Sequence, residues 1–403
     1  MTERLYYTDS FLYDFDARVV ESRDMGGRSA VVLDRTAFYP ASGGQTCDVG
    51  TLKILGSAEV RVEQVEEAED GAILHFGSAP IDQGAIIHGT IDAARRRDHM
   101  QQHSGQHVLS AAYVRLFDVP TVSFHMGEES CTIDLETRSI SPAQVEKAER
   151  LANDVVTEDR PVEIRLVTPD EARKLGVRKI PEAERHKLRL IDIRDFDLTA
   201  CGGTHVRSTG QIGAILLRKT ENVKQGVRVE FVCGGRAIST ARHDYSALAD
   251  AAGALSTHIW ELPQQIRKSL DDAKTSAKAQ QRLLEELAEM HAVRLLAATS
   301  AENGRKKIAR VIADRDLIFV RLLAQKIAAA GEPAIVLLAS TAGQPTLVFA
   351  QSPGLPSDMG AQMKTAMAAL GGRGGGNREF AQGGVASANK IGSVLEEIAR
   401  ALE

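Results

Sequence analysis

Two short motifs, far apart in the chain, each place two metal-binding side chains close together. The first is His103-Ser-Gly-Gln-His107 and the second is Cys201-Gly-Gly-Thr-His205. In a helix, His103 and His107 lie one turn apart on the same face, so both imidazoles can reach one cation. The Gly-Gly pair of the second motif allows a sharp turn that brings Cys201 and His205 toward that helix. Any fold of this chain is therefore expected to bring the two motifs together.

Either motif alone is weak evidence for a metal, because histidines occur at these spacings by chance. Both motifs in one chain are typical of a zinc site, in which short-range ligand pairs are joined across a long gap. We therefore predict that Zn²⁺ is held by His103, His107, Cys201 and His205. Four protein ligands are typical of a structural site, whereas catalysis needs an open position, so we expect one ligand, His205, to bind weakly or to yield to water.

The composition indicates a globular protein with room for two or three cores, since 43% of its 403 residues are hydrophobic and 26% are charged. No apolar run approaches the ~20 residues of a membrane helix, and the N-terminal Met-Thr-Glu-Arg has no hydrophobic signal core, so we expect a cytoplasmic protein without membrane contact. The net charge of -5 means that any RNA contact must be local. The cysteines are unclustered, which indicates reduced thiols: Cys47, Cys131, Cys201 and Cys233.

Residues 1–93 contain short alternating apolar segments broken by Gly and Asp, which predicts a small N-terminal β-barrel. Within this region, residues 38–45 (Phe-Tyr-Pro-Ala-Ser-Gly-Gly-Gln) predict a rigid turn whose glycines let the backbone come very near another part of the molecule. A plain structural corner of the barrel is the alternative interpretation. The predicted strands include Leu5–Tyr7, Ala30–Leu33, Val60–Val65, Ile73–His75 and Ile86–Ile91.

Residues 94–236 predict a central α+β domain that holds the zinc site. Its first helix carries the two histidines of the first motif, and Asp98 is expected to cap that helix, with Gln101 completing a capping box. A second helix is expected to begin at Ser141-Pro142 and to end at about Glu158. The expected strands are Thr121–Phe124, Ser130–Leu135, Val162–Thr168, Leu188–Ile193, Ile212–Lys219 and Gly226–Cys233.

Residues 237–299 are rich in Ala, Leu, Glu, Lys and Gln with apolar residues at helical spacing, which predicts a long helical connector. Residues 300–403 alternate helix and strand and predict a C-terminal α/β domain. Its glycine-dense stretch, residues 371–384, contains seven glycines together with Arg373 and Arg378, and predicts a loop whose backbone forms a phosphate-binding nest. Because the stretch fits no dinucleotide or Walker pattern, RNA backbone is the favoured ligand.

The two metal motifs, the segment Tyr39-Pro-Ala-Ser-Gly-Gly-Gln45 and the terminal glycine stretch together resemble the long form of the alanyl-tRNA editing proteins (AlaX). The resemblance covers essentially the whole chain. The first two domains look like the editing half of alanyl-tRNA synthetase, and residues 371–384 match the GGxGGGxxxxAQGG pattern of that enzyme's C-terminal domain. No class II aminoacylation domain can be placed in this chain, so we expect it to deacylate tRNA and not to charge it.

The resemblance implies hydrolysis, in trans, of tRNA(Ala) mischarged with serine or glycine, with the four zinc ligands as the catalytic centre. The strand after the histidine helix falls where the family has a polar residue that contacts the amino-acid hydroxyl. Ser123 is the candidate, and His125 is an alternative pocket residue that is equally well explained as an ordinary strand histidine. Thr204 is expected to orient the substrate. Further expectations are RNA contacts at Arg373, Gly374, Gly375, Gly376 and Arg378, and a homodimer through the C-terminal region.

Physical chemistry supports the need for such an enzyme. A synthetase pocket fitted to alanine discriminates only about 10 to 200-fold against an amino acid that adds a hydroxyl or lacks a methyl. A second site must therefore recognise the serine hydroxyl, which alanine cannot satisfy. Two other classes stay open: a zinc-stabilised RNA-binding module without hydrolysis, and a zinc peptidase. The peptidase is disfavoured because Ser-Gly-Gln between the histidines lacks the glutamate base of H-E-x-x-H enzymes.

Overall fold

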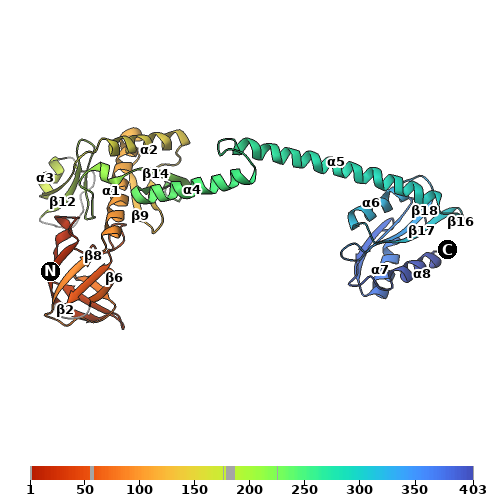
Figure 1. Cartoon of the computed structure of the whole chain (residues 1–403), viewed down its shortest axis with the longest axis horizontal. Coiled ribbons are helices and arrows are strands. Elements are labelled where there is room, and N and C mark those ends of the chain that lie inside the picture. Colours follow the sequence, from red (N-terminus) through yellow and green to blue (C-terminus); the bar gives the residue numbers. More distant parts are fainter. Residues whose placement is uncertain (1, 55–58, 176, 178–186, 225, 403) are drawn as a thin grey trace. The chain divides into compact units, whose positions relative to one another are not determined.

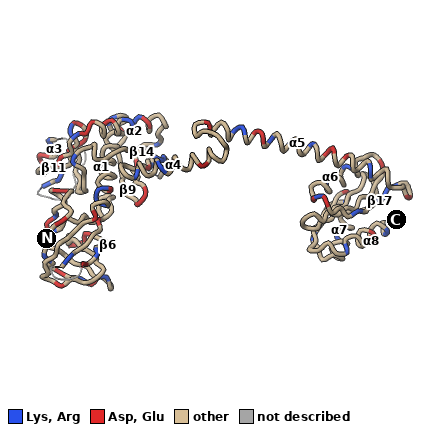
Figure 2. The backbone as a smooth tube through the Cα atoms, viewed as in Figure 1, with Lys and Arg blue, Asp and Glu red and all other residues tan. Residues whose placement is uncertain are grey.

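The computed structural model describes residues 2–54, 59–175, 177, 187–224 and 226–402 (Figure 1). The chain forms two compact units, Met1–Asp250 and Ala251–Glu403. Acidic and basic residues are interspersed along both units (Figure 2). Over the described ranges, no helix has both the length and the apolar content that a membrane crossing requires. The boundaries predicted at residues 93, 236 and 299 remain predictions.

The first unit begins with a closed barrel of six strands, as predicted. Buried and exposed residues alternate along its strands; in β2, for example, Phe15, Ala17 and Val19 point inward and their neighbours outward. The prediction of a strand at Leu5–Tyr7 is wrong. This segment forms the 3₁₀ helix η1, because the amide and hydroxyl of Thr8 donate hydrogen bonds to the carbonyl of Leu5 and close a turn. The barrel closes in the order β2 (Asp14–Asp24), β3 (Ser29–Leu33), β7 (Ile73–Gly77), β6 (Glu59–Glu67), β5 (Gly50–Ile54) and β8 (Ile86–Ile91).

Helix α1 (Ala93–Phe117) follows the barrel directly and carries the first metal motif. Its N-cap is Asp92, whose side chain accepts hydrogen bonds from the backbone amides of Ala94 and Arg95. The predicted cap at Asp98 is therefore wrong, because the helix already begins where strand β8 ends. Asp98 lies inside the helix and forms an ion pair with Arg236 at 2.6 Å.

Two antiparallel sheets and a second helix complete the first unit around a core that includes Val108, Leu109, Tyr113 and Phe231. Helix α2 (Pro142–Thr157) begins with the Ser141/Gln144 capping box, close to the predicted start. A short helix, α3 (Pro169–Lys174), follows β11. One sheet has the order β14 (Ile215–Val223), β15 (Gly226–Cys233), β10 (Cys131–Leu135) and β9 (Thr121–Met126), and the other has the order β11 (Val162–Val167), β12 (Leu188–Ile193) and β13 (Asp197–Ala200).

The second unit is a mixed sheet with helices, preceded by the helices predicted over residues 237–299. These are α4 (Gly234–Ala254), which begins in the first unit, and α5 (Leu262–Ala297). Within the sheet, β17 and β18 are parallel and the other pairs are antiparallel. Its elements are β16 (Ala301–Glu302), β17 (Arg305–Ile312), α6 (Leu317–Ala328), β18 (Ala334–Ser340), β19 (Thr346–Gln351), α7 (Met359–Leu370), β20 (Arg373–Gly376), β21 (Phe380–Gly384) and α8 (Ile391–Ala401).

The glycine-dense stretch is the β20–β21 hairpin, which pairs with β19 through β21. The predicted loop with a backbone nest is therefore wrong. The physical reason is close packing: a Cβ on Gly374 would lie 2.4 Å from the Cα of Gly383, and one on Gly383 would lie 2.6 Å from the sulfur of Met367. The glycines let the two strands and helix α7 approach one another.

A buried ion pair fastens helix α1 to the barrel. The side chains of Arg96 and Asp48 are both 0% exposed and are 2.5 Å apart at their nearest atoms. The guanidinium also donates to the backbone carbonyls of Ser10 at 2.7 Å and Ala37 at 2.6 Å. The pair therefore fixes the start of the helix on which the metal motif lies.

Replacing Arg96 by Met should destabilise the first unit by about 3–5 kcal/mol, because the Asp48 carboxylate would stay buried without its partner. In calorimetry of the full chain, the melting temperature of the first unit should fall by roughly 6–20 °C, while that of the second unit should not move. Arg150→Met is the control, since it removes only an exposed pair with Glu146. An Arg96 variant that melts like the wild type would contradict this role of the pair.

Candidate metal centre

The structure brings the two motifs together at one buried point. One ligand atom from each of His103, His107, Cys201 and His205 lies within 4.8 Å of all the others. The Nε2 atoms of His103 and His205 lie 3.1 Å and 3.4 Å from the Cys201 sulfur. Three imidazole nitrogens and a thiolate are a donor set that zinc accepts in tetrahedral geometry with bonds of about 2.0–2.3 Å. The four residues therefore fit a zinc ion.

Two different local structures present these ligands. His103 and His107 lie one turn apart on α1 with their rings stacked, at a centroid distance of 5.2 Å and an angle of 28°. Cys201 directly follows strand β13, and His205 lies beyond the Gly-Gly turn. The His205 ring stands at 85° to that of His103, with centroids 4.7 Å apart. The helix and the turn thus meet at the ring of His205.

The Gly-Gly turn is required by space and not by backbone conformation, because neither glycine has a positive φ. A Cβ on Gly203 would lie 2.5 Å from Cε1 and 2.8 Å from Nε2 of His103, which is far inside contact distance. A Cβ on Gly202 would meet Tyr7 at ordinary contact distances, its hydroxyl at 3.5 Å and its Cε1 at 3.8 Å. The amide of Gly203 donates to the Cys201 sulfur at 3.3 Å. The absence of a side chain at Gly203 therefore lets the backbone of the turn pack directly against the His103 ring.

Side chains behind the ligands fix the orientation of the rings. Asp197 Oδ2 lies 3.7 Å from His107 Nδ1, and Ser104 Oγ lies 3.2 Å from His205 Nδ1. In both rings this leaves Nε2 to face the cluster. Partners of this kind set the tautomer and the aim of a metal-bound imidazole.

The electrostatics of the cluster favour an ionised thiol. Burial by itself raises the pKa of Cys201, but the neighbouring imidazoles of His103, His205 and His107 bring this pKa well below its usual value. Burial lowers the pKa of His107, yet the Cys201 thiolate and Asp197 outweigh it and raise the pKa to about 9. Burial also lowers the pKa of His205 to about 3. The thiolate is the form of cysteine that binds metals, whereas a metal bound by His107 must displace the proton of that imidazole.

The barrel contributes to the centre through residues 38–45. Gln45 accepts a hydrogen bond from the amide of Thr204 at 3.2 Å and donates one to its hydroxyl at 2.9 Å. Gly44, at φ +82°, lies so close to β9 that a Cβ would be 2.2 Å from the Phe124 carbonyl oxygen. Close backbone approach is therefore the correct interpretation of this segment, and a plain barrel corner is not. Thr204, predicted to orient the substrate, is fully buried with its hydroxyl bound to Gln45.

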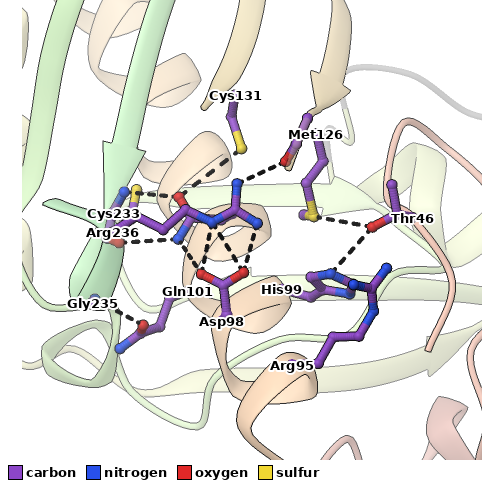
Figure 3. A network of polar contacts seen from close by, with 12 residues as sticks. Thr46, Arg95, Asp98, His99, Gln101, Met126, Cys131, Cys233, Gly235 and Arg236 are labelled. Atoms are coloured by element: carbon purple, nitrogen blue, oxygen red, sulfur yellow. Dashed lines mark hydrogen bonds and ion pairs between the residues drawn. The ribbon is translucent and has the colours of Figure 1, made fainter. Parts of the chain in front are cut away.

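A polar network positions α1 against the sheet (Figure 3). Arg236, at the start of α4, pairs with Asp98 and donates to the carbonyl of Gly127 at 2.7 Å. On the same helix, His99 Nε2 is 3.2 Å from the hydroxyl of Thr46, and Gln102 Oε1 accepts from the amide of Cys233 at 2.8 Å. The helix that carries the ligands is thus held by the barrel on one side and by the sheet on the other.

A pocket of about 380 Å³ opens beside the metal cluster. Ser123, the predicted substrate contact, lines it and donates to Asp134 at 2.8 Å. His125, the alternative, is exposed on β9 and is not among the lining residues. His107 lines the pocket, whereas His205 does not. The lining residues are Gln106, His107, Ser110, Pro120, Thr121, Val122, Ser123, Phe124 and Thr199.

Sequence reasoning missed several of these residues. Gln106 had a usable signal, because it stands between the two histidines on the same helix. Thr199 and Asp197 had none, because only the fold brings them to the centre, whereas Gln45 ends the segment 38–45 that the sequence marks for close approach. Of the predicted RNA contacts, Arg373 is exposed on β20, and Arg378 donates to the carbonyl of Pro356, all within the second unit.

Comparison with known proteins gives the family. Residues 188–229 match the threonyl and alanyl tRNA synthetase second additional domain, and residues 4–95 match the class II (A) tRNA synthetases. The alanyl-tRNA editing protein AlaX-L of Pyrococcus horikoshii is 33% identical, over 96% of this chain and 95% of its own length. The chain belongs to the alanyl-tRNA editing protein family. It is also 33% identical to the alanine–tRNA ligase of Pyrococcus furiosus, but spans only 43% of that enzyme's length.

The match at residues 188–229 contains Cys201 and His205 of the candidate metal cluster, and the match at residues 4–95 contains the barrel. The alanine–tRNA ligase of Pyrococcus abyssi is 32% identical to this chain, and the match covers 100% of this chain and 44% of that enzyme. The chain thus spans less than half the length of the ligases it matches. Both halves of the metal centre lie within the region shared with the editing protein.

Replacing Gly203 by Ala should remove metal from the purified protein, because the added methyl group would occupy the space of the His103 ring. Zinc content, measured by elemental analysis after dialysis, should fall from about one ion per chain to a small fraction of that. Gly202→Ala is the matched control and should keep its metal, since its methyl group has room. Equal zinc in both variants would contradict the steric role of Gly203.

Proposed function

We propose that this protein is a zinc-dependent deacylase that edits tRNA(Ala) in trans, by hydrolysing the ester between a wrong amino acid and the tRNA. The observation that carries the proposal is a buried cluster of three imidazoles and a thiolate directly beside a pocket, in a chain of the alanyl-tRNA editing family. Thiolate and imidazole donors suit zinc, whereas magnesium and calcium prefer oxygen ligands.

His103, His107, Cys201 and His205 would hold the ion. Zinc in such a site polarises a carbonyl or lowers the pKa of a bound water to about 7. His107 is the ligand that borders the pocket, so we place the ester on its side of the cluster. Asp197 contacts the Nδ1 of His107 and thereby keeps its Nε2 directed at the cluster. The carboxylate would act through the ring and not on the substrate.

The pocket is proposed to test the amino acid for a hydroxyl group. Its wall combines the apolar face of Phe124 with the polar side chains of Ser123, Gln106 and Thr199. A polar group here that pairs with the serine hydroxyl would be left unpaired by alanine, at a cost of about 1–3 kcal/mol. Ser-tRNA(Ala) is therefore the proposed first substrate and Gly-tRNA(Ala) the second.

The second unit is proposed to bind tRNA through the β20–β21 hairpin, with Arg373, Gly374, Gly375, Gly376 and Arg378 as contacts. The exposed edge strand β20 and the exposed side chain of Arg373 support this. Homodimerisation through this unit is supported by large apolar side chains that α5 leaves exposed, among them Leu283, Met290 and Val293 at 60–70% exposure.

The proposal is tested by incubating Ser-, Gly- and Ala-tRNA(Ala) with the full chain, with and without a chelator. We expect release of serine, slower release of glycine, retention of alanine, and loss of activity on chelation that added zinc restores. The double variant His103→Ala/Cys201→Ala should stay folded and lose deacylation, while His88→Ala, an exposed barrel histidine, should not. Binding of tRNA with intact Ser-tRNA(Ala) would instead favour an RNA-binding module without hydrolysis.

Ser123→Ala should lower kcat/KM for Ser-tRNA(Ala) roughly tenfold while leaving Gly-tRNA(Ala) nearly unchanged, because one hydrogen bond to the serine hydroxyl is lost. His125→Ala is the matched control on the same strand and should affect neither substrate. A selective loss in the His125 variant instead would transfer the role to that histidine and contradict the assignment of Ser123.

A further inference from the structure

Arg189, on strand β12, holds the turn that carries the metal-binding cysteine. One of its terminal nitrogens, Nη1, donates to the carbonyl of Cys201 at 2.7 Å and to that of Gly203 at 3.0 Å. A second donor, Nε, reaches the carbonyl of Tyr7 at 2.9 Å. A single guanidinium thus grips the chain on both sides of Gly202 and ties it to the N-terminal segment.

The backbone of the same residue adds a further contact. The carbonyl of Arg189 accepts a hydrogen bond from the amide of Cys201 at 3.2 Å, where the pairing of β12 with β13 ends. Main chain and side chain of Arg189 therefore hold the turn from the amide of Cys201 to the carbonyl of Gly203. Within that span, the Gly203 amide points at the Cys201 sulfur.

The charge of Arg189 is unusual for a residue with a purely structural task. Arg189 is only 8% exposed. In the parts of the chain that the structure describes, no carboxylate forms an ion pair with it. Burying a cation without a carboxylate partner is costly unless hydrogen bonds offset the lost hydration. Here the backbone carbonyls of Tyr7, Cys201 and Gly203 accept these hydrogen bonds.

We propose that Arg189 is a positioning residue of the metal centre, whose guanidinium sets the Cys201–Gly203 turn so that the sulfur meets the three imidazoles. The inference rests on the proposed zinc centre and is independent of which ester is hydrolysed. Loss of the guanidinium should free the two carbonyls and weaken the bond between the metal and Cys201. Lysine cannot replace it fully, since an ammonium group presents its donors at one point and not as a planar fork.

The test uses the full-length chain loaded with cobalt(II) or zinc. Arg189→Met should bind zinc about 10 to 100-fold more weakly in competition with a chelator, as is typical when a partner behind a metal ligand is lost. In the cobalt(II) protein, the near-ultraviolet thiolate-to-cobalt charge-transfer band of Arg189→Met should be weaker than that of the wild type. The zinc affinity and band intensity of Arg189→Lys should lie between those of Arg189→Met and the wild type. Arg165→Met is the matched control: it lies on the neighbouring strand, pairs at the surface with Asp192, and should bind both metals like the wild type.

A folded Arg189→Met protein with wild-type zinc affinity and an unchanged thiolate–cobalt band would overturn the proposal. Should the methionine variant fail to fold, the lysine variant decides in the same way, with wild-type values counting against a guanidinium clamp. Wild-type protein that shows no thiolate–cobalt band would overturn the zinc centre and this inference together. If the wild-type protein shows the thiolate–cobalt band but does not hydrolyse Ser-tRNA(Ala), only the proposed deacylase activity is contradicted. The Arg189 variants would still decide the role of Arg189.

Discussion

The candidate metal centre depends on one close contact, that between the Gly203 backbone and the ring of His103. It is part of a wider pattern, because two other glycines allow comparable approaches around the site. A Cβ on Gly105 would lie 2.3 Å from the sulfur of Cys233, and one on Gly44 would meet the carbonyl of Phe124. A glycine inside a helix costs roughly 0.5–1 kcal/mol relative to alanine, and here it lets α1 lie against β15. Three backbones are thus packed around the ligands more tightly than side chains would permit.

The sequence predicted those features whose cause is local. The spacing of His103 and His107 fixes their common face on any helix. Local alternation also marks the barrel strands β3, β6, β7 and β8, but not β2 or β5, which were not among the strands named from the sequence. The helix start was misplaced because Asp98 satisfies the same local rule as Asp92, and only the end of β8 decides between them. The glycine-dense stretch was misjudged because glycine signals both turns and close packing, and only the position of helix α7 distinguishes the two.

The remaining parts of the centre could not be predicted, because they come from segments that meet only in the folded chain. Gln45 belongs to the barrel and Asp197 to β13, and each acts on a ligand motif far away in sequence, whereas Arg189 on β12 acts on a turn 12 residues further along the chain. No periodicity marks them. Their common trait is a buried polar group that contacts the backbone or side chain of a residue within a ligand motif, which is a property of the assembled core and not of any window of sequence.

The same elements that carry the four candidate ligands also build the pocket, so in the proposed function recognition and chemistry would be coupled. Gln106 and Ser110 lie on α1 beside His107, and Thr199 lies on β13 two residues before Cys201. The barrel fixes the start of that helix through Arg96, and β12 fixes the turn through Arg189, so neither half of the cluster can shift without moving a wall of the pocket. An amino acid bound in the pocket, as we propose, would be placed at a constant distance from the cluster, which is the condition for positioning to lower a reaction barrier.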